Sequence, residues 1–165
     1  MQKLIDQALI GVSARINNEV NKSLGEYISK NNIKSTIALT NSIDRGFIAL
    51  GNELLLLLNK LFKVGLKIED IDKANEIINN YLEVEIKTII KTCEEMTNFS
   101  IDNLNLNQFI LKNKEELKVQ LEFEFLYIKQ EIKKHRKAVR WDLFKLTISA
   151  ILGSTITIVV RHFLQ

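Results

Sequence analysis

The chain has 165 residues, of which 46% are apolar and 26% are charged, and its net charge is +3. This composition allows a packed core and excludes both a disordered chain and a wholly membrane-embedded protein. The net charge is too small to indicate nucleic acid as a partner by itself. There is no proline and there are only six glycines. Long helices are therefore favoured over a β-sandwich or barrel, which needs many turns.

The first half of the chain predicts two helices. From residue 2 to about residue 30 apolar residues recur at three- and four-residue steps, which indicates an amphipathic helix. Its stripe is expected to hold Ile5, Leu9, Val12, Ile16, Val20, Leu24 and Tyr27 or Ile28. A second helix is predicted from Ser35, a suitable N-cap, to about Val64, with Gly65 as the glycine that ends it. Its apolar face is expected to hold Ile37, Ile43, Phe47, Leu50, Leu54, Leu57, Leu58 and Leu61.

A third helix is predicted from Glu69 to about Thr97, because acidic residues in its first turn suit the positive end of the helix dipole. Lys87 and Lys91 are expected to pair along this helix with Glu83 and with Glu94 or Glu95. Its inward stripe is expected to hold Ile71, Ala74, Ile78, Leu82 with Tyr81, Ile86 or Glu85, Ile89, Cys93 and Met96.

The polar stretch from Asn98 to Asn107 is a predicted loop, and a fourth helix is predicted to begin near Asn107. Apolar and polar residues alternate from Val119 to Tyr127, which is also a strand pattern. Helix is favoured there because both flanks are strong helix formers and a single strand would have no partner. Nothing between Gln108 and Leu152 breaks a helix, so this helix is expected to continue into the C-terminal apolar stretch.

That stretch, Leu146–Val160, contains no charged residue. Fifteen residues make about 22 Å of helix, against about 30 Å of hydrocarbon in a bilayer. Extending it to Trp141–Leu164 gives a full span if Lys145 and Arg161 reach opposite interfaces. Trp141 then lies where interfacial aromatic residues are found. The alternative is a buried bundle helix, which the short core and the position of Lys145 favour.

Small residues mark one face of the apolar stretch. Ser149, Gly153 and Thr157 follow one another at four-residue spacing, and such residues let transmembrane helices approach closely. We therefore expect the homo-oligomer interface at Ser149, Gly153 and Thr157, with Trp141, Lys145 and Arg161 at the membrane boundaries.

A basic segment, Lys129–Arg140, precedes the apolar stretch and holds six Lys or Arg against the single Glu131. Three interpretations are open: binding of nucleic-acid phosphates, a solvated helix face, or contact with anionic lipid headgroups. Its position directly before Trp141 favours lipid. The expected lipid-contacting residues are Lys133, Lys134, Arg136, Lys137 and Arg140.

Catalytic signatures are not found in the sequence, which has no phosphate-binding loop, zinc-protease or nucleophile-elbow motif. Cys93 with His135 is a conceivable nucleophile pair, but a buried structural cysteine is the favoured interpretation. Glu131 and His135 share a helix face, yet two ligands do not make a metal site. The single cysteine fits a reducing compartment. We therefore predict no catalytic residue, no metal and no cofactor, and not an enzyme.

Together these patterns predict an all-α fold: a cytoplasmic bundle of about four long helices over residues 1–140 and a C-terminal transmembrane anchor over residues 141–165. The excess of basic residues before the span places the N-terminus on the cytoplasmic side of the inner membrane. The predicted partners are the lipid bilayer, further copies of the chain and another protein, with nucleic acid disfavoured.

Three functional hypotheses follow. The first is a tail-anchored homo-oligomeric effector that permeabilises the membrane or forms a pore, because hydroxyl-bearing residues could line a channel. The second is a membrane-tethered helical scaffold or regulator that binds a protein partner. The third is a soluble bundle that binds nucleic acid through Lys129–Arg140.

Overall fold

The computed structural model describes the backbone of residues 2–104 and 106–163, and the side chains of residues 2–102, 104 and 106–149. Its helices are α1 (Gln2–Ser29), α2 (Thr36–Lys63), α3 (Ile68–Thr97), the short 3₁₀ helix η1 (Asp102–Leu104) and α4 (Asn107–Phe163). Within these ranges there is no strand, so the predicted all-α class is confirmed. The chain divides into two compact units, Met1–Tyr127 and Ile128–Gln165.

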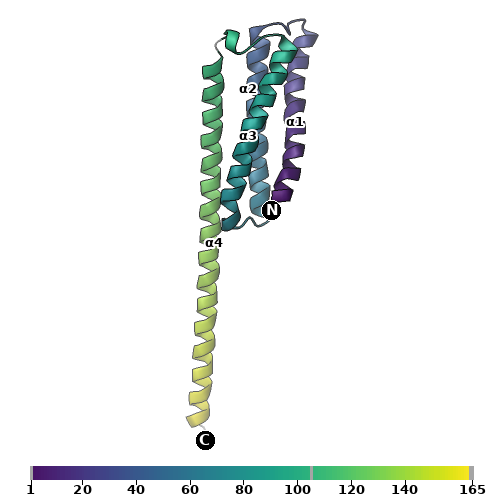
Figure 1. Cartoon of the computed structure of the whole chain (residues 1–165). Coiled ribbons are helices and arrows are strands. Elements are labelled where there is room, and N and C mark those ends of the chain that lie inside the picture. Colours follow the sequence, from purple (N-terminus) through teal and green to yellow (C-terminus); the bar gives the residue numbers. More distant parts are fainter. Residues whose placement is uncertain (1, 105, 164–165) are drawn as a thin grey trace. The chain divides into compact units, whose positions relative to one another are not determined.

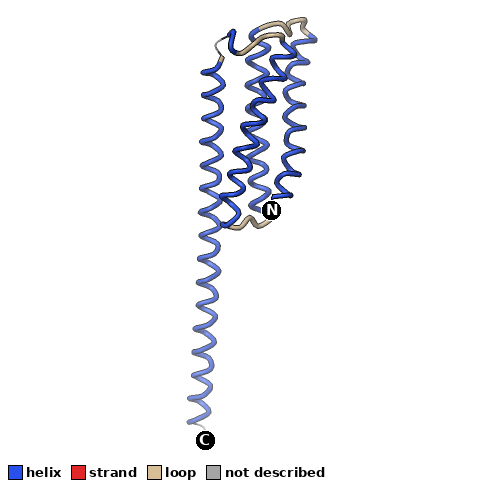
Figure 2. The backbone as a smooth tube through the Cα atoms, in the orientation of Figure 1, coloured by secondary structure: helices blue, strands red, loops and turns tan. Residues whose placement is uncertain are grey.

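In the first unit, α1, α2 and α3 lie side by side as neighbouring helices (Figures 1 and 2). Each buries one apolar stripe, as amphipathic helices in a bundle do. The predicted stripe of α1 is confirmed from Ile5 to Leu24 but not at Tyr27 or Ile28, which are not buried, and most of the stripes of α2 and α3 are confirmed. The buried residues of α1 include Ile5, Leu9, Val12, Ile16, Val20 and Leu24.

The ends of α2 are formed as the sequence predicts. The Ser35 hydroxyl accepts a hydrogen bond from the amide of Ala38 at 3.1 Å, which satisfies a donor of the first turn. At the other end Gly65 adopts φ +95°, and the next amide, that of Leu66, donates to the carbonyl of Leu61 at 3.1 Å. This left-handed glycine closes the helix because glycine enters that region without steric cost.

Two residues predicted to face inward are exposed instead. Ile37 in the first turn of α2 is 58% exposed, and Met96 near the end of α3 is 47% exposed. Thr97 takes the inward position in place of Met96, because it is buried and its hydroxyl donates to the carbonyl of Cys93 at 2.7 Å. A threonine can be buried there because its own helix supplies the hydrogen-bond acceptor.

The part of α4 in the first unit is helical throughout, so the strand alternative for Val119–Tyr127 is wrong. Its inward face carries Leu117, Leu121 and Phe125, all buried. This spacing of four residues is that of one helix face, and the flanking helix formers outweigh the alternating pattern. An added Cβ at Gly51 of α2 would lie 3.0 Å from Leu117, which places α4 against α2.

An ion-pair network joins α4 to α3, and it corrects the predicted pairing of Glu83. We expected Glu83 to pair with Lys87 along α3. Instead the Glu83 carboxylate accepts from Lys114 at 2.6 Å and from Lys118 at 2.7 Å, both on α4. Lys91 pairs with Glu95 at 3.8 Å, as expected. Each of the two carboxylate oxygens of Glu83 therefore has a lysine of α4 as its partner.

The hydrogen bonds from Lys114 and Lys118 lower the pKa of Glu83. A carboxylate with a lowered pKa stabilises the fold above its unfolded pKa, about 4.3, and loses that contribution as the pH falls through its folded pKa. We expect Glu83→Gln to be less stable than wild type at pH 7, by under about 1 kcal/mol because the pair is partly solvated. The difference should shrink as the pH falls below about 4. Urea unfolding between pH 3 and 7 measures it, and Glu95→Gln is the exposed control.

Candidate functional site

The first unit contains a polar layer of three residues between α1 and α3, and sequence analysis did not identify it. The hydroxyls of Ser13 and Tyr81 lie 2.7 Å apart, and Ser13 also donates to Glu85 Oε2 at 2.7 Å. Glu85 is 4% exposed, and its other oxygen, Oε1, has no hydrogen-bond partner. Burial raises the pKa of Tyr81, so its phenol stays protonated and can donate to Ser13. Two signals were present in the sequence: Tyr81 was predicted beside Leu82 in the inward stripe, and Glu85 was an alternative to Ile86 there.

We expect Ser13→Ala to lower the free energy of unfolding by about 1–2 kcal/mol, because it removes the hydroxyl between Tyr81 and Glu85 and leaves both without that partner. The matched control is Ser29→Ala in the same helix, whose exposed hydroxyl donates only to the backbone carbonyl of Glu26 at 2.9 Å. Chemical denaturation at pH 7 compares the two variants. Equal effects would show that the Ser13 network contributes no more than an exposed hydroxyl.

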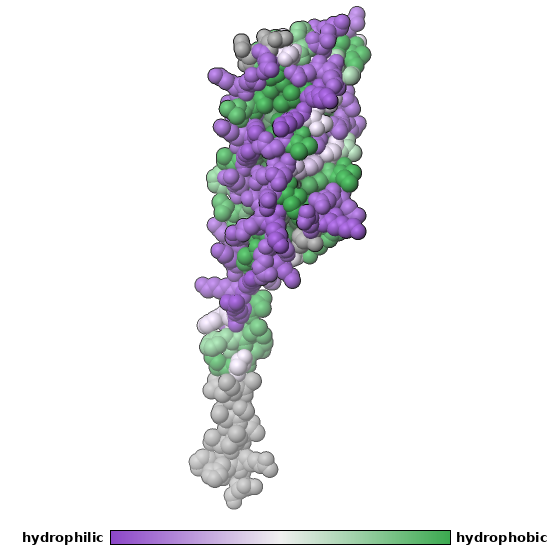
Figure 3. All heavy atoms as spheres, viewed as in Figure 1, coloured by the Kyte–Doolittle hydropathy of each residue, from purple (hydrophilic) through white to green (hydrophobic). Residues whose placement is uncertain are grey.

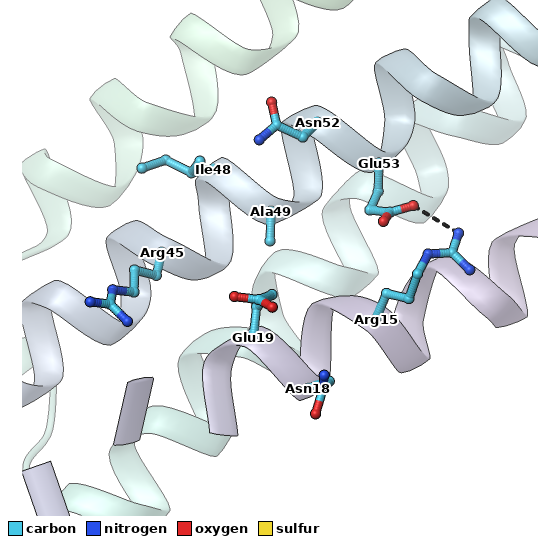
Figure 4. A pocket seen from close by; sticks show the side chains of 8 residues that line it. All are labelled: Arg15, Asn18, Glu19, Arg45, Ile48, Ala49, Asn52 and Glu53. Atoms are coloured by element: carbon cyan, nitrogen blue, oxygen red, sulfur yellow. Dashed lines mark ion pairs between the residues drawn. The ribbon is translucent and has the colours of Figure 1, made fainter. Parts of the chain in front are cut away.

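A surface groove of about 490 Å³ lies between α1 and α2 (Figure 4). Arg15 reaches across it to Glu53 at 2.7 Å, and this contact raises the pKa of Arg15. Beside it Arg45 pairs with Glu26 at 2.9 Å. These arginines are therefore neutralised by carboxylates of the facing helix, and the two ion pairs bridge α1 and α2. Its lining also includes Asn18, Glu19, Ile48, Ala49 and Asn52.

Cys93 is fully buried in the inward stripe of α3. Burial raises the pKa of its thiol to about 12, which keeps it protonated, whereas a nucleophilic cysteine needs a thiolate. Within the described ranges no three His, Cys, Asp or Glu side chains come close enough to hold a metal ion. Cys93 is thus a buried core residue, which agrees with the favoured interpretation of a structural cysteine.

The basic segment lies on α4 in the second unit, and every residue from 133 to 149 is exposed. Figure 3 shows these residues as a hydrophilic stretch of helix followed by an apolar one. All five residues predicted to contact lipid are therefore exposed. Two of them, Lys133 and Lys134, lie within one turn of Glu131. Lys134 pairs with Glu131 at 2.7 Å. The full predicted set is Lys133, Lys134, Arg136, Lys137 and Arg140.

Aromatic and apolar side chains follow the basic segment directly. The rings of Trp141 and Phe144 are stacked with centroids 5.6 Å apart, and the Lys145 ammonium lies 5.7 Å from the Trp141 ring. Trp141 is 57% exposed. A cation near an indole face is attracted by the ring quadrupole, and the Lys145 ammonium also pairs with Asp142 at 3.8 Å. The other exposed apolar residues here are Val139, Leu143, Leu146 and Ile148.

The predicted membrane and oligomer residues fall into two groups. Trp141, Lys145 and Ser149 are exposed on α4. The side chains of Gly153, Thr157 and Arg161 lie outside the described residues, so the contact predicted for the Ser149, Gly153 and Thr157 face stays a prediction. Among the helices as far as the structure describes them, none is apolar over enough of its length to cross a membrane.

Comparison with protein-family models, with curated protein sequences and with solved structures gives no match to this chain.

Proposed function

We propose that this chain is a helical-bundle protein that attaches to anionic membranes through α4 and, when several copies assemble, permeabilises them. In this proposal the basic segment contacts lipid headgroups, Trp141 lies at the interface, and the stretch Leu146–Val160 enters the hydrocarbon. The observation that carries the proposal is the uninterrupted exposure of residues 133–149, where basic residues are followed by a mainly aromatic and apolar stretch that includes the ion pair of Asp142 and Lys145.

Both the charge and the aromatic residues of the exposed segment support contact with an anionic membrane. Clustered Lys and Arg beside an anionic surface contribute about 1 kcal/mol each. Exposed tryptophan, phenylalanine and leucine on consecutive turns are unfavourable in water and favourable at a headgroup boundary. The apolar stretch continues from Ala150 to Val160 without a charged residue, and the proposed span includes these residues.

The attachment is tested with Trp141, which is the only tryptophan in the chain and therefore a site-specific reporter. The full chain is mixed with vesicles of phosphatidylcholine alone or with added phosphatidylglycerol. We expect its emission to move to shorter wavelength and the protein to float with the anionic vesicles. The triple variant Arg136→Glu, Lys137→Glu, Arg140→Glu should need more anionic lipid for the same effect. Unchanged emission together with protein left at the bottom of the gradient would refute attachment.

Permeabilisation is tested separately by release of a trapped dye. Small residues at four-residue spacing allow close helix approach in lipid, so Gly153→Leu is expected to suppress release while the protein still floats with the vesicles. Release at the wild-type rate by this variant would exclude assembly through the Ser149 and Gly153 face. Intact vesicles at high loading of wild-type protein would exclude permeabilisation and leave attachment standing.

A further inference from the structure

A stripe of four large apolar side chains on α4 has no partner in the described chain. Val119 is 50% exposed, Phe123 68%, and Leu126 and Tyr127 55% each. Val119, Phe123 and Tyr127 follow one another at four-residue spacing, and Leu126 lies three residues after Phe123, which places all four on one side of the helix. The residues that α4 buries, Leu117, Leu121 and Phe125, lie on the opposite face. Exposed apolar residues scattered singly are ordinary, whereas a contiguous stripe marks an interaction surface.

The exposed side of α4 is mainly acidic before and beside this stripe and basic after it. Glu115, Glu116 and Glu122 are exposed there. Lys112 is exposed as well and pairs with Glu116 at 3.7 Å, whereas Lys114 and Lys118 bind Glu83 of α3. The basic segment Lys129–Arg140 follows it in the same helix. A parallel pairing of two such helices would set acid against acid and base against base. An antiparallel pairing sets the acidic residues of each helix against the basic residues of the other.

We propose that the stripe is the contact of an antiparallel homodimer, in which α4 of one copy packs along α4 of a second copy. The register that sets Phe123 against Leu126 of the second copy buries the largest side chains at the centre. The same register brings Glu116 opposite Lys133 of the second copy. Because the contact is two-fold symmetric, each pair occurs twice.

This dimer is independent of the proposed membrane attachment, because its apolar contact lies before the basic segment and needs no lipid. It is also distinct from the predicted contact through Ser149 and Gly153. Failure of one of these contacts therefore leaves the other standing. Sedimentation of the full chain in a mild non-ionic detergent, without lipid, separates them.

Wild-type protein is expected to sediment as a dimer at micromolar concentrations. Phe123→Glu should raise the dimer dissociation constant at least thirtyfold, since it places a charge at the centre of the contact twice. Gly153→Leu should leave the dissociation constant within about twofold of wild type. A monomeric wild-type chain would overturn the proposal. So would a dimer that Gly153→Leu dissociates and Phe123→Glu does not.

The orientation is tested by exchanging charges. Glu116→Lys should weaken the dimer at least fivefold, and so should Lys133→Glu. The double variant should return to within about twofold of wild type, because the pair is restored with its signs reversed. Glu95→Lys is the matched control: Glu95 is also an exposed glutamate four residues after its lysine partner, Lys91, at 3.8 Å, but it lies on α3. A double variant no tighter than the single variants would overturn the antiparallel register.

Discussion

Gly46→Ala in α2 is expected to lower the free energy of unfolding by about 1–3 kcal/mol, the usual cost of overpacking a core. A Cβ at this position would lie 2.6 Å from Ile89 Cγ2 on α3 and 3.1 Å from a methyl of Val20 on α1. The Cγ2 of isoleucine is attached directly to its stiff Cβ, so it cannot swing aside. The three helices would have to separate locally.

The control for this variant is Gly25→Ala in α1, where an added Cβ meets nothing within 4 Å. Alanine has the higher helix propensity by about 1 kcal/mol, so this change should stabilise the protein. Denaturant unfolding measures both. Ile89→Leu removes the branched methyl and should recover part of the loss in a Gly46→Ala background. If Gly46→Ala and Gly25→Ala both stabilise, the close approach of α1, α2 and α3 is wrong.

The helices could be predicted because the apolar residues that each one buries are spaced regularly in its own sequence. The stripes of α1, α2 and α3 are visible as three- and four-residue spacing, and Ser35 and Gly65 mark the ends of α2 by local chemistry. Such signals depend only on residues one or two turns apart. Errors arose in terminal turns, at Ile37 and Met96, where a helix face meets the end of the bundle and the apolar pattern no longer decides burial.

Contacts between helices could not be predicted in the same way. The role of Gly46 depends on Ile89, and the partners of Glu83 lie on α4, about thirty residues further along the chain. The polar layer of Ser13, Tyr81 and Glu85 joins α1 to α3. Nothing local to these residues distinguishes them from ordinary polar positions, because their significance comes from the neighbour that the fold supplies.

The basic segment was identified from sequence because charge and apolar content are one-dimensional properties. Whether the residues after the basic segment are buried could not be decided from the sequence, because a buried bundle helix was the alternative for them. From 133 to 149 the described side chains lie on the surface, which is unfavourable for Leu143, Phe144 and Leu146 in water. Exposed apolar surface is typical of an interaction site, and our proposal names an anionic lipid surface as the partner because basic residues precede it.

A charge placed within the stretch Leu146–Val160 tests most directly whether this stretch enters a lipid bilayer. Leu152→Lys places a charge one residue from its centre, where a lysine costs about 3 kcal/mol in hydrocarbon. We expect vesicle affinity to fall about a hundredfold, since each 1.4 kcal/mol is tenfold. Flotation of the full chain with increasing amounts of anionic vesicles measures the affinity.

The control is Leu143→Lys, which adds the same charge beside Trp141 at the proposed interface. A lysine there can extend its ammonium to the headgroups and should cost little. The difference between the two variants separates insertion from surface attachment. If residues 146–160 only lie on the bilayer or do not contact it, Leu152→Lys and Leu143→Lys will bind vesicles equally well, because neither charge then enters hydrocarbon and both add to the attraction for anionic lipid.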